Sequence, residues 1–183
     1  MYVFLIILIM VAGALSMPLW MPRAWYRAIY YPGGRPNALA RRNNALMAWI
    51  HGRGIAPSLM VTLETRGRRT GKILRVPLVV AEFEGNRYLV SMLGEHADWV
   101  RNLRTSGGEA LMLHGSVETI RTEEVSVAER APILRAYLKR APGARPHFDI
   151  DMNAPLEDFA RVAARYPVFR ILPQTASAGT LDS

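Results

Sequence analysis

The sequence predicts an α+β domain built on a small antiparallel β-barrel with flanking helices. Short stretches of alternating apolar and polar residues are joined by hairpin turns, and segments of helical period fall between them in no regular alternation. Closing short strands into a barrel removes their exposed edges. The 183 residues suit one domain, and because half of them are apolar the chain is not disordered. The lack of cysteine excludes disulfide scaffolds and thiolate chemistry.

The amino-terminal segment differs from the rest of the chain. Of the first 21 residues, 18 are apolar and none is charged. A helix over 2–21 would be ~30 Å long, the thickness of a bilayer's hydrocarbon core. Cations follow this segment and none precedes it, which places the folded domain in the cytoplasm. We therefore expect a transmembrane helix over 1–21, as a single pass of the cell membrane. A cleaved signal peptide is the alternative, although its basic n-region is missing.

Cations and aromatic rings follow the apolar segment. Up to Val80 the chain has 11 basic residues and one acid, whereas the remainder has 12 basic and 14 acidic residues, so the net charge of +8 belongs to the first part. Rings interleaved with arginines are typical of a membrane interface. We expect 22–57 to contact membrane lipid as a basic, aromatic interface segment with a connecting helix over 37–51. The rings and cations are Trp20, Trp25, Tyr26, Tyr30, Tyr31, Arg23, Arg27 and Arg35.

The barrel domain is expected over 58–173, followed by a polar tail over 174–183. Glycine-containing turns separate its strand signals, and Ser126 with Glu129 matches a capping box at the start of a helix. Strands are expected over 58–65, 74–83, 87–93, 110–114, 117–124 and 168–172, and helices after Asp98, after Ser126 and over 156–163.

The connection between the first two strands, 65–75, is the most unusual stretch. It holds five cations, the Thr70 hydroxyl and two glycines. Glycines let backbone amides turn toward an anion, and arginine offers a rigid fork of donors for phosphate or carboxylate. The stretch therefore suits a multiply anionic small molecule. An exposed hairpin with solvated or lipid-attracted arginines is the alternative, and the absence of aromatic residues within it argues against nucleic acid.

A second stretch, 91–103, reads as the end of a strand, a turn at Gly94 and the start of a helix. Amides at a helix start can bind anions or ring oxygens, and Trp99 could form the wall of a planar ligand site. The alternative is an ordinary connection with Trp99 and Leu103 in the core.

Other kinds of site have little support. The four histidines have no metal-ligand spacing, so no metal is expected, and there is no Gly-x-Ser-x-Gly elbow, Walker loop or dinucleotide fingerprint. No catalytic acid is identified, because Tyr88, Tyr137 and Tyr166 are either proton donors, substrate walls or core residues.

Together the two stretches resemble the deazaflavin (F420)-dependent nitroreductase and quinone reductase family over 58–172. The resemblance implies a split β-barrel that binds the hydride donor coenzyme F420. The residues that carry it are Gly67-Arg68-Arg69-Thr70-Gly71, Arg75, Val76-Pro77-Leu78, Tyr88-Leu89-Val90-Ser91, Gly94, Trp99, Asn102-Leu103 and the closing Tyr166-Pro167-Val168-Phe169-Arg170.

The resemblance also implies roles for individual residues. Many family members have arginine where this chain has Leu74, with Arg75 following it, and often a basic residue where this chain has Met92. The coenzyme's phosphate and acidic tail would be held by Arg68, Arg69, Thr70, Gly71 and Arg75; its ring would be lined by Pro77, Ser91, Met92, Leu93 and Gly94; and Trp99 and Asn102 would close the pocket.

The implied function is an oxidoreductase that transfers a hydride from reduced F420 to an organic acceptor of the quinone or nitro class. The membrane segment favours a lipophilic acceptor that enters from the bilayer. One alternative is a split barrel that uses flavin mononucleotide (FMN), although a single phosphate needs fewer cations than the basic connection offers. The other is a non-enzymatic module that binds the coenzyme or lipid at the membrane surface.

Overall fold

A computed structural model describes residues 21–172 of the chain. The expected transmembrane helix falls almost entirely on 1–20, and the polar tail on 173–183, so both lie outside the described residues. Within the described range, no helix is both long and apolar enough to span a bilayer.

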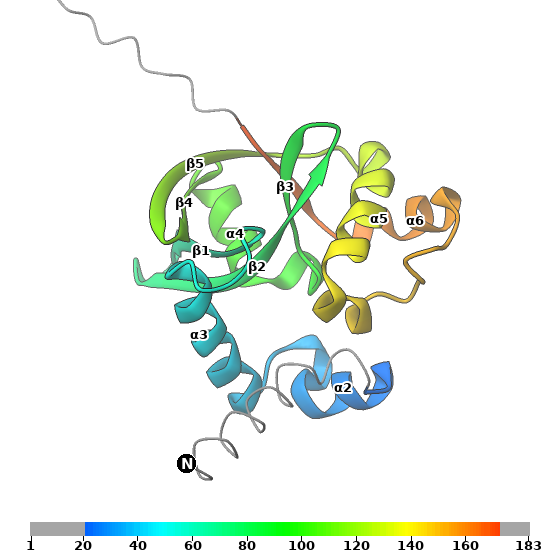
Figure 1. The fold of residues 1–183 in the computed structure, drawn as a ribbon, viewed down its shortest axis with the longest axis horizontal. Coiled ribbons are helices and arrows are strands. Elements are labelled where there is room, and N and C mark those ends of the chain that lie inside the picture. The colour runs from blue at the N-terminus through cyan, green and yellow to red at the C-terminus, as the bar shows by residue number, and fades with distance from the viewer. Residues whose placement is uncertain (1–20, 173–183) are drawn as a thin grey trace, which may run out of the picture.

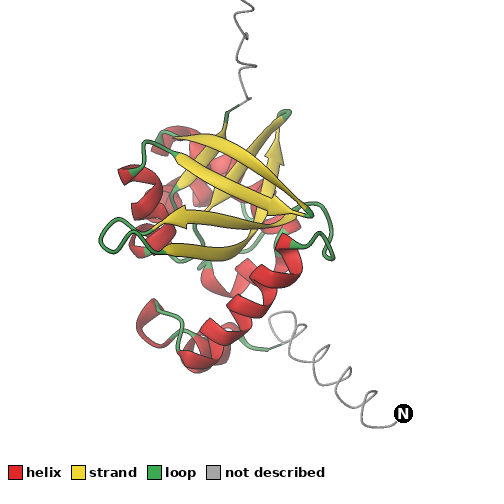
Figure 2. Ribbon diagram, turned by 90° about the vertical axis from the view of Figure 1, so that its left-hand side faces the viewer, coloured by secondary structure: helices red, strands yellow, loops and turns green. Residues whose placement is uncertain are grey.

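Six antiparallel strands form a closed barrel, which confirms the predicted fold class (Figure 2). They pair in the order β1-β2-β3-β6-β5-β4. Hairpins join β1 to β2, β2 to β3 and β4 to β5, while β6 closes the barrel by inserting between β3 and β5. The strands are β1 (Met60–Arg66), β2 (Ile73–Phe83), β3 (Asn86–Val90), β4 (Glu109–His114), β5 (Ser116–Glu124) and β6 (Val168–Ile171).

Alternation along the strands separates the barrel interior from its outer face. Leu63 of β1 pairs with Val76 of β2, and both belong to the apolar cluster inside the barrel, which also contains Leu89 and Phe169. The residues between them point outward, as expected from the period of two.

The helices cover the barrel in two groups (Figure 1). α5 and α6 pack together against the barrel and bury an outer cluster that includes Tyr88, Leu134 and Phe159. α2 and α3 lie at another side, and α4 follows the β3 turn. The α-helices are α2 (Arg23–Tyr30), α3 (Ala38–Gly52), α4 (Asp98–Thr105), α5 (Arg130–Arg140) and α6 (Leu156–Val162), and single 3-10 turns include η4 (Pro142–His147).

The end of β3 and the start of α5 differ from the sequence prediction in ways that have a structural reason. β3 ends at Val90 because the chain turns immediately afterwards, toward Gly94. The predicted capping box does not form: the Ser126 hydroxyl donates to the Glu129 carboxylate at 2.5 Å, neither side chain caps the backbone, and α5 begins only at Arg130.

Candidate active site

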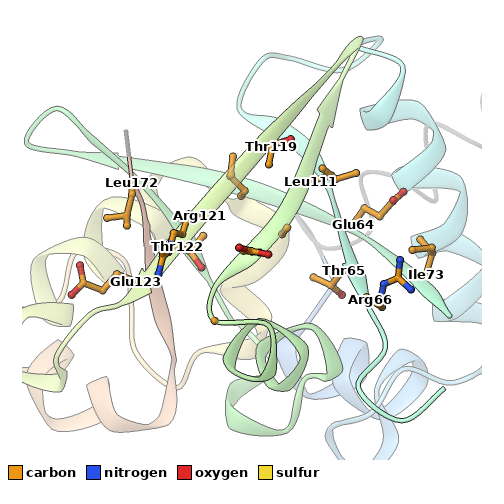
Figure 3. Close-up of a pocket in the computed structure, with 14 residues that line it drawn as sticks. Glu64, Thr65, Arg66, Ile73, Leu111, Thr119, Arg121, Thr122, Glu123 and Leu172 are labelled. Carbon is orange, nitrogen blue, oxygen red and sulfur yellow. The ribbon is translucent and has the colours of Figure 1, made fainter. Parts of the chain in front are cut away.

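Two hollows compete for the site on the described part of the molecule. The larger, about 1060 Å³, lies on the outer side of β4 and β5 and reaches the ends of β1 and β2 (Figure 3). Two of its three carboxylates are already paired, Glu64 with Arg75 at 2.7 Å and Glu123 with Arg170 at 3.0 Å. None of the twelve residues expected to hold the coenzyme lines it. This polar groove is therefore a poor match to an apolar ring.

The second hollow is a cavity of about 520 Å³ between the barrel and helices α2 and α3. Four of the residues expected around the coenzyme ring line it together: Pro77, Met92, Leu93 and Trp99. They come from β2, the turn after β3 and α4. The structure thus gathers residues up to 22 positions apart onto one largely apolar wall, which we call the barrel wall.

The turn after β3 explains how two of these side chains reach the cavity. Ser91 is buried, its hydroxyl donates to the Gly94 carbonyl at 2.8 Å, and its amide donates to the Pro167 carbonyl at 2.9 Å. Gly94 has φ +75°, and a Cβ there would lie 3.0 Å from the Arg165 carbonyl oxygen. Ser91 and Gly94 therefore shape the turn, while Met92 and Leu93 present their side chains to the cavity.

Helix α4 joins the cavity to the basic loop between β1 and β2. Trp99 lines the cavity and packs against Phe169, with ring centroids 5.7 Å apart. Three residues further along, Asn102 is 2% exposed: its Oδ1 accepts from the Arg68 amide at 3.2 Å and its Nδ2 donates to the Thr65 hydroxyl at 3.1 Å. Asn102 thus ties the basic loop to the helix that carries Trp99, and does not line the cavity.

The basic loop over 67–72 is a compact, exposed turn. The Gly67 amide donates to the Lys72 carbonyl and the Gly71 amide to the Gly67 carbonyl, both at 2.8 Å. Within the described residues Arg68 forms an ion pair with Asp98 at 3.1 Å, whereas Arg69 and Lys72 have no carboxylate partner. The loop, including Thr70 and Gly71, lines neither hollow; it holds unneutralised positive charge beside α4.

The structure also places Leu74 and Arg75, where the arginine of the family pattern is shifted by one residue in this chain. Leu74 pairs with Thr65 and is half-buried against the apolar cluster of the barrel interior. Arg75 points outward and pairs with Glu64, two residues from Pro77 on the same face of β2. Arg75 is therefore available at the outer surface, although it lies outside the cavity lining.

The opposite wall of the cavity, which we call the roof, is one that the sequence prediction missed. It includes Tyr26, Tyr31, Asn44 and Met47 from the chain before the barrel, together with Tyr137 of α5. Tyr26 and Tyr31 were expected at a membrane interface, but they are only 8% and 5% exposed. Their packing against η4, which is distant in sequence, gives no local signal.

Burial sets the protonation of the roof phenols. Burial raises the pKa of Tyr26, and that of Tyr31, above the usual value for tyrosine. Tyr26 and Asn44 partly oppose this effect for Tyr31, because both can donate hydrogen bonds to its oxygen. Tyr31 therefore remains a neutral phenol at physiological pH, with its own proton available for donation.

His147 packs behind these phenols. Its ring meets that of Tyr31 edge to face, with centroids 4.5 Å apart, and its Nε2 has no hydrogen-bond partner among residues 21–172. Burial, with a smaller effect from the Arg27 guanidinium, lowers the pKa of His147 to about 4. The ring is therefore neutral near pH 7 and supports the roof as an apolar group.

Comparison with known proteins identifies the family. The family model described as F420H(2)-dependent quinone reductase matches residues 38–147. The chain belongs to this family. It is therefore an oxidoreductase whose cofactor is coenzyme F420, as the resemblance implied.

Solved structures and curated proteins add little to this result. Similar structures include an F420-H2 dependent reductase, FDR-A (20% identity over 62% of this chain and 94% of that chain, TM-score 0.43), and a heme-binding protein from Mycobacterium smegmatis (19%, 68% and 50%, TM-score 0.43). A conserved hypothetical protein, Rv2991, from Mycobacterium tuberculosis is also similar (14%, 67% and 78%, TM-score 0.46). All three TM-scores are below 0.5, which is too low to support an assignment of function. No curated protein matches the chain.

The residues present fit the coenzyme. An apolar cavity suits a planar ring, and a cationic loop suits a phosphate and a carboxylate tail. α4 places Trp99 and Asn102 only about 4.5 Å apart along its axis, so the two features adjoin. No group of His, Asp or Glu within 21–172 could hold a metal ion.

Proposed function

We propose that this protein reduces a lipophilic quinone with reduced F420 bound in the 520 Å³ cavity. The observation that carries the proposal is the pairing of two unlike walls around one cavity: an apolar barrel wall joined through α4 to the cationic loop, and a phenol-bearing roof. The first suits the coenzyme and the second suits a carbonyl-containing acceptor.

The basic loop over 67–72 and the barrel wall would hold the coenzyme. Arg69 and Lys72, which lack carboxylate partners in the described chain, would form charge-assisted hydrogen bonds with the anionic tail. Met92, Leu93 and Trp99 would contact the ring and exclude water from it. When bound, reduced F420 supplies the hydride.

Tyr31 is the group we assign to the acceptor. Reduction of a quinone carbonyl places negative charge on its oxygen, and a neutral phenol stabilises that charge by donating a hydrogen bond. Because burial raises the pKa of Tyr31, its hydroxyl keeps its proton until charge develops on the acceptor. Tyr26 and Asn44 would donate hydrogen bonds to the Tyr31 oxygen, which leaves the Tyr31 proton free to point toward the cavity.

The acceptor class and the location are linked. A nitro compound could accept the same hydrogen bond, but the apolar amino-terminal residues favour an acceptor that is dissolved in a membrane. We propose that residues 1–21 anchor the protein in the cell membrane, with the folded domain in the cytoplasm.

Anaerobic oxidation of reduced F420 by the full-length chain tests this function. We expect turnover with a long-chain naphthoquinone, weaker turnover with a nitroaromatic compound, and tighter binding of F420 than of FMN. Failure of the quinone to oxidise reduced F420 would exclude the proposal.

A matched pair of leucine variants tests the location of the site. Leu93→Arg places a charge in the cavity, whereas Leu111→Arg places one in the larger groove of Figure 3. Only Leu93→Arg should reduce F420 affinity, by more than about tenfold. Loss of affinity in Leu111→Arg alone would move the site to the larger groove.

A further inference from the structure

The described molecule concentrates its exposed apolar side chains in the segment that precedes the barrel. Six of its ten exposed large hydrophobic residues fall within 25–55, on α2, α3 and the loop that follows α3. We call them the α2–α3 face: Trp25, Ile29, Leu39, Leu46, Trp49 and Ile55.

The α3 helix shows that this exposure is patterned. Its buried residues, Ala40, Ala48 and His51, lie on one side of the helix. At 100° per residue, Leu46 and Trp49 project from the opposite side, which in a soluble domain is normally polar. Trp49 is 51% exposed and Leu46 is 46% exposed.

The cations around this face are all arginines, and the stretch of sequence that carries them contains no acidic residue. The first acidic residue of the chain is Glu64. Arg23 and Arg27 pair with Asp151 and Asp149 of the loop after η4. The other arginines of this part, Arg35, Arg41, Arg42 and Arg53, have no carboxylate partner among the described residues.

Chemistry favours a bilayer as the occupant of this face. Tryptophan and leucine interleaved with arginine are typical of helices that lie in the plane of an anionic membrane. The guanidinium of Arg53 stacks 4.3 Å above the Trp49 ring, which leaves the cation and the ring at one surface, as at a headgroup layer. The uncharged residues 1–20 precede α2 directly, so the chain enters this face from an apolar segment.

We propose that the α2–α3 face rests on an anionic lipid bilayer, as a contact separate from residues 1–20. The cavity adjoins this face, because Tyr30, Asn43 and Ile50 line the cavity from the same two helices. A lipophilic acceptor would then pass from the bilayer into the cavity, and this last consequence rests on the proposed function.

The absence of cysteine permits a direct test with single labels. Leu46→Cys on the face and Val127→Cys on η3 (Val127–Glu129) are matched positions, since Leu46 is 46% exposed and Val127 is 47% exposed. The full-length chain is labelled at either position with an environment-sensitive fluorophore and inserted into vesicles of phosphatidylcholine and phosphatidylglycerol. We expect a blue shift and quenching by brominated lipid at position 46, and neither effect at position 127.

Other results would overturn the proposal. An unshifted label at 46, or equal shifts at both positions, would show that the face does not enter the bilayer. A blue shift at 46 that increases with protein concentration, without vesicles, would instead identify a second copy of the chain as the occupant. An equal shift in vesicles of phosphatidylcholine alone, or after Arg42→Glu, would refute the role assigned to the arginines.

The same samples separate this proposal from the proposed function. Both labelled chains should bind F420 equally. Loss of F420-dependent turnover with the shift at 46 intact would refute the function and leave the membrane contact standing.

Discussion

The barrel wall and the roof of the cavity are built in different ways. The barrel wall comes from within the residues matched by the family model, 38–147, and hydrogen bonds around Ser91 and Asn102 hold it in place. The roof phenols Tyr26 and Tyr31 come from α2 and the residue just after it, before the matched range. These phenols are held by ring packing and by an exposed ion pair of Arg27 with Asp149. The barrel wall thus lies wholly within the part of the chain that the family model matches, whereas two of the roof's phenols lie before it.

The largest expected effect comes from cutting the link between the barrel wall and the basic loop. Asn102→Ala leaves the Arg68 amide and the Thr65 hydroxyl without their partner. We expect the free energy of unfolding to fall by about 2–4 kcal/mol, and the affinity for F420 to fall with it. Chemical denaturation and F420 titration at a temperature where the variant remains folded measure both.

Asn86→Ala is the control for this variant. Asn86 begins β3 just after the β2–β3 turn, and its side-chain amide donates to the Glu84 carbonyl at 3.1 Å. Its replacement should change stability by about 0.5 kcal/mol or less, without affecting F420. A destabilised Asn102→Ala protein that binds F420 normally would show that the loop has no part in the cofactor site.

The second prediction isolates the charge of the loop from its position. Arg69→Ala should weaken F420 binding by ~1.5–3 kcal/mol and leave stability unchanged, because Arg69 is exposed and has no carboxylate partner in the described chain. Arg121→Ala, in the larger groove, is the matched loss of a cation and should have no effect on binding. Calorimetric titration at low and high salt measures the difference, and equal losses in the two variants would point to long-range charge alone.

The third prediction concerns the roof and its dependence on pH. The folded-state pKa of His147 is lowered to about 4, so the folded protein binds this proton less readily than the unfolded chain. Stability is therefore present above pH 6.5 and is lost as the pH falls toward 4, by about 2 kcal/mol at pH 5. Burial also lowers the pKa of His51, so His51 adds to the loss of stability as the pH falls.

Replacement of His147 separates its contribution from that of His51. His147→Phe keeps a ring against Tyr31 and should flatten this part of the stability profile, whereas the same change at the exposed His96 should not. Denaturation midpoints between pH 7 and 5 measure the effect. A profile that is equally steep in His147→Phe would contradict the assignment.

The barrel was predictable because its signals are local. Alternation placed the strands within a few residues, and Asn37 caps α3 as an asparagine before a helix commonly does, accepting from the Ala40 amide at 2.9 Å. The insertion of β6 between β3 and β5 was not predicted, because pairing over such a distance leaves no periodic signal. The end of β3 was missed because Met92 and Leu93 continue the apolar pattern of the strand. These side chains line the cavity and do not belong to the strand.

The site was predictable only in part, and for a related reason. Pro77, Met92, Leu93 and Trp99 were expected to meet, and they do. Tyr31 was assigned to lipid because its sequence neighbours are arginines, yet its packing partner His147 lies 116 residues away. Tyrosines in a segment without acidic residues, directly before a helix, can lie either at a membrane interface or in the packed interior. The sequence therefore marks these tyrosines as candidates, but only tertiary contacts decide between the two environments.

The smallest expected effect tests the roof's chemical role most directly. Tyr31→Phe retains the ring that packs on His147 and removes only the hydroxyl. We expect kcat for quinone reduction to fall about five- to tenfold, the equivalent of ~1–1.4 kcal/mol, because one neutral hydrogen bond to the developing oxyanion is lost. F420 affinity should be unchanged, since the barrel wall and the loop are intact. Tyr88→Phe, a buried tyrosine outside the cavity, should leave both quantities unchanged. If Tyr31→Phe raised KM with kcat unaltered, the hydroxyl would bind the acceptor without assisting its reduction.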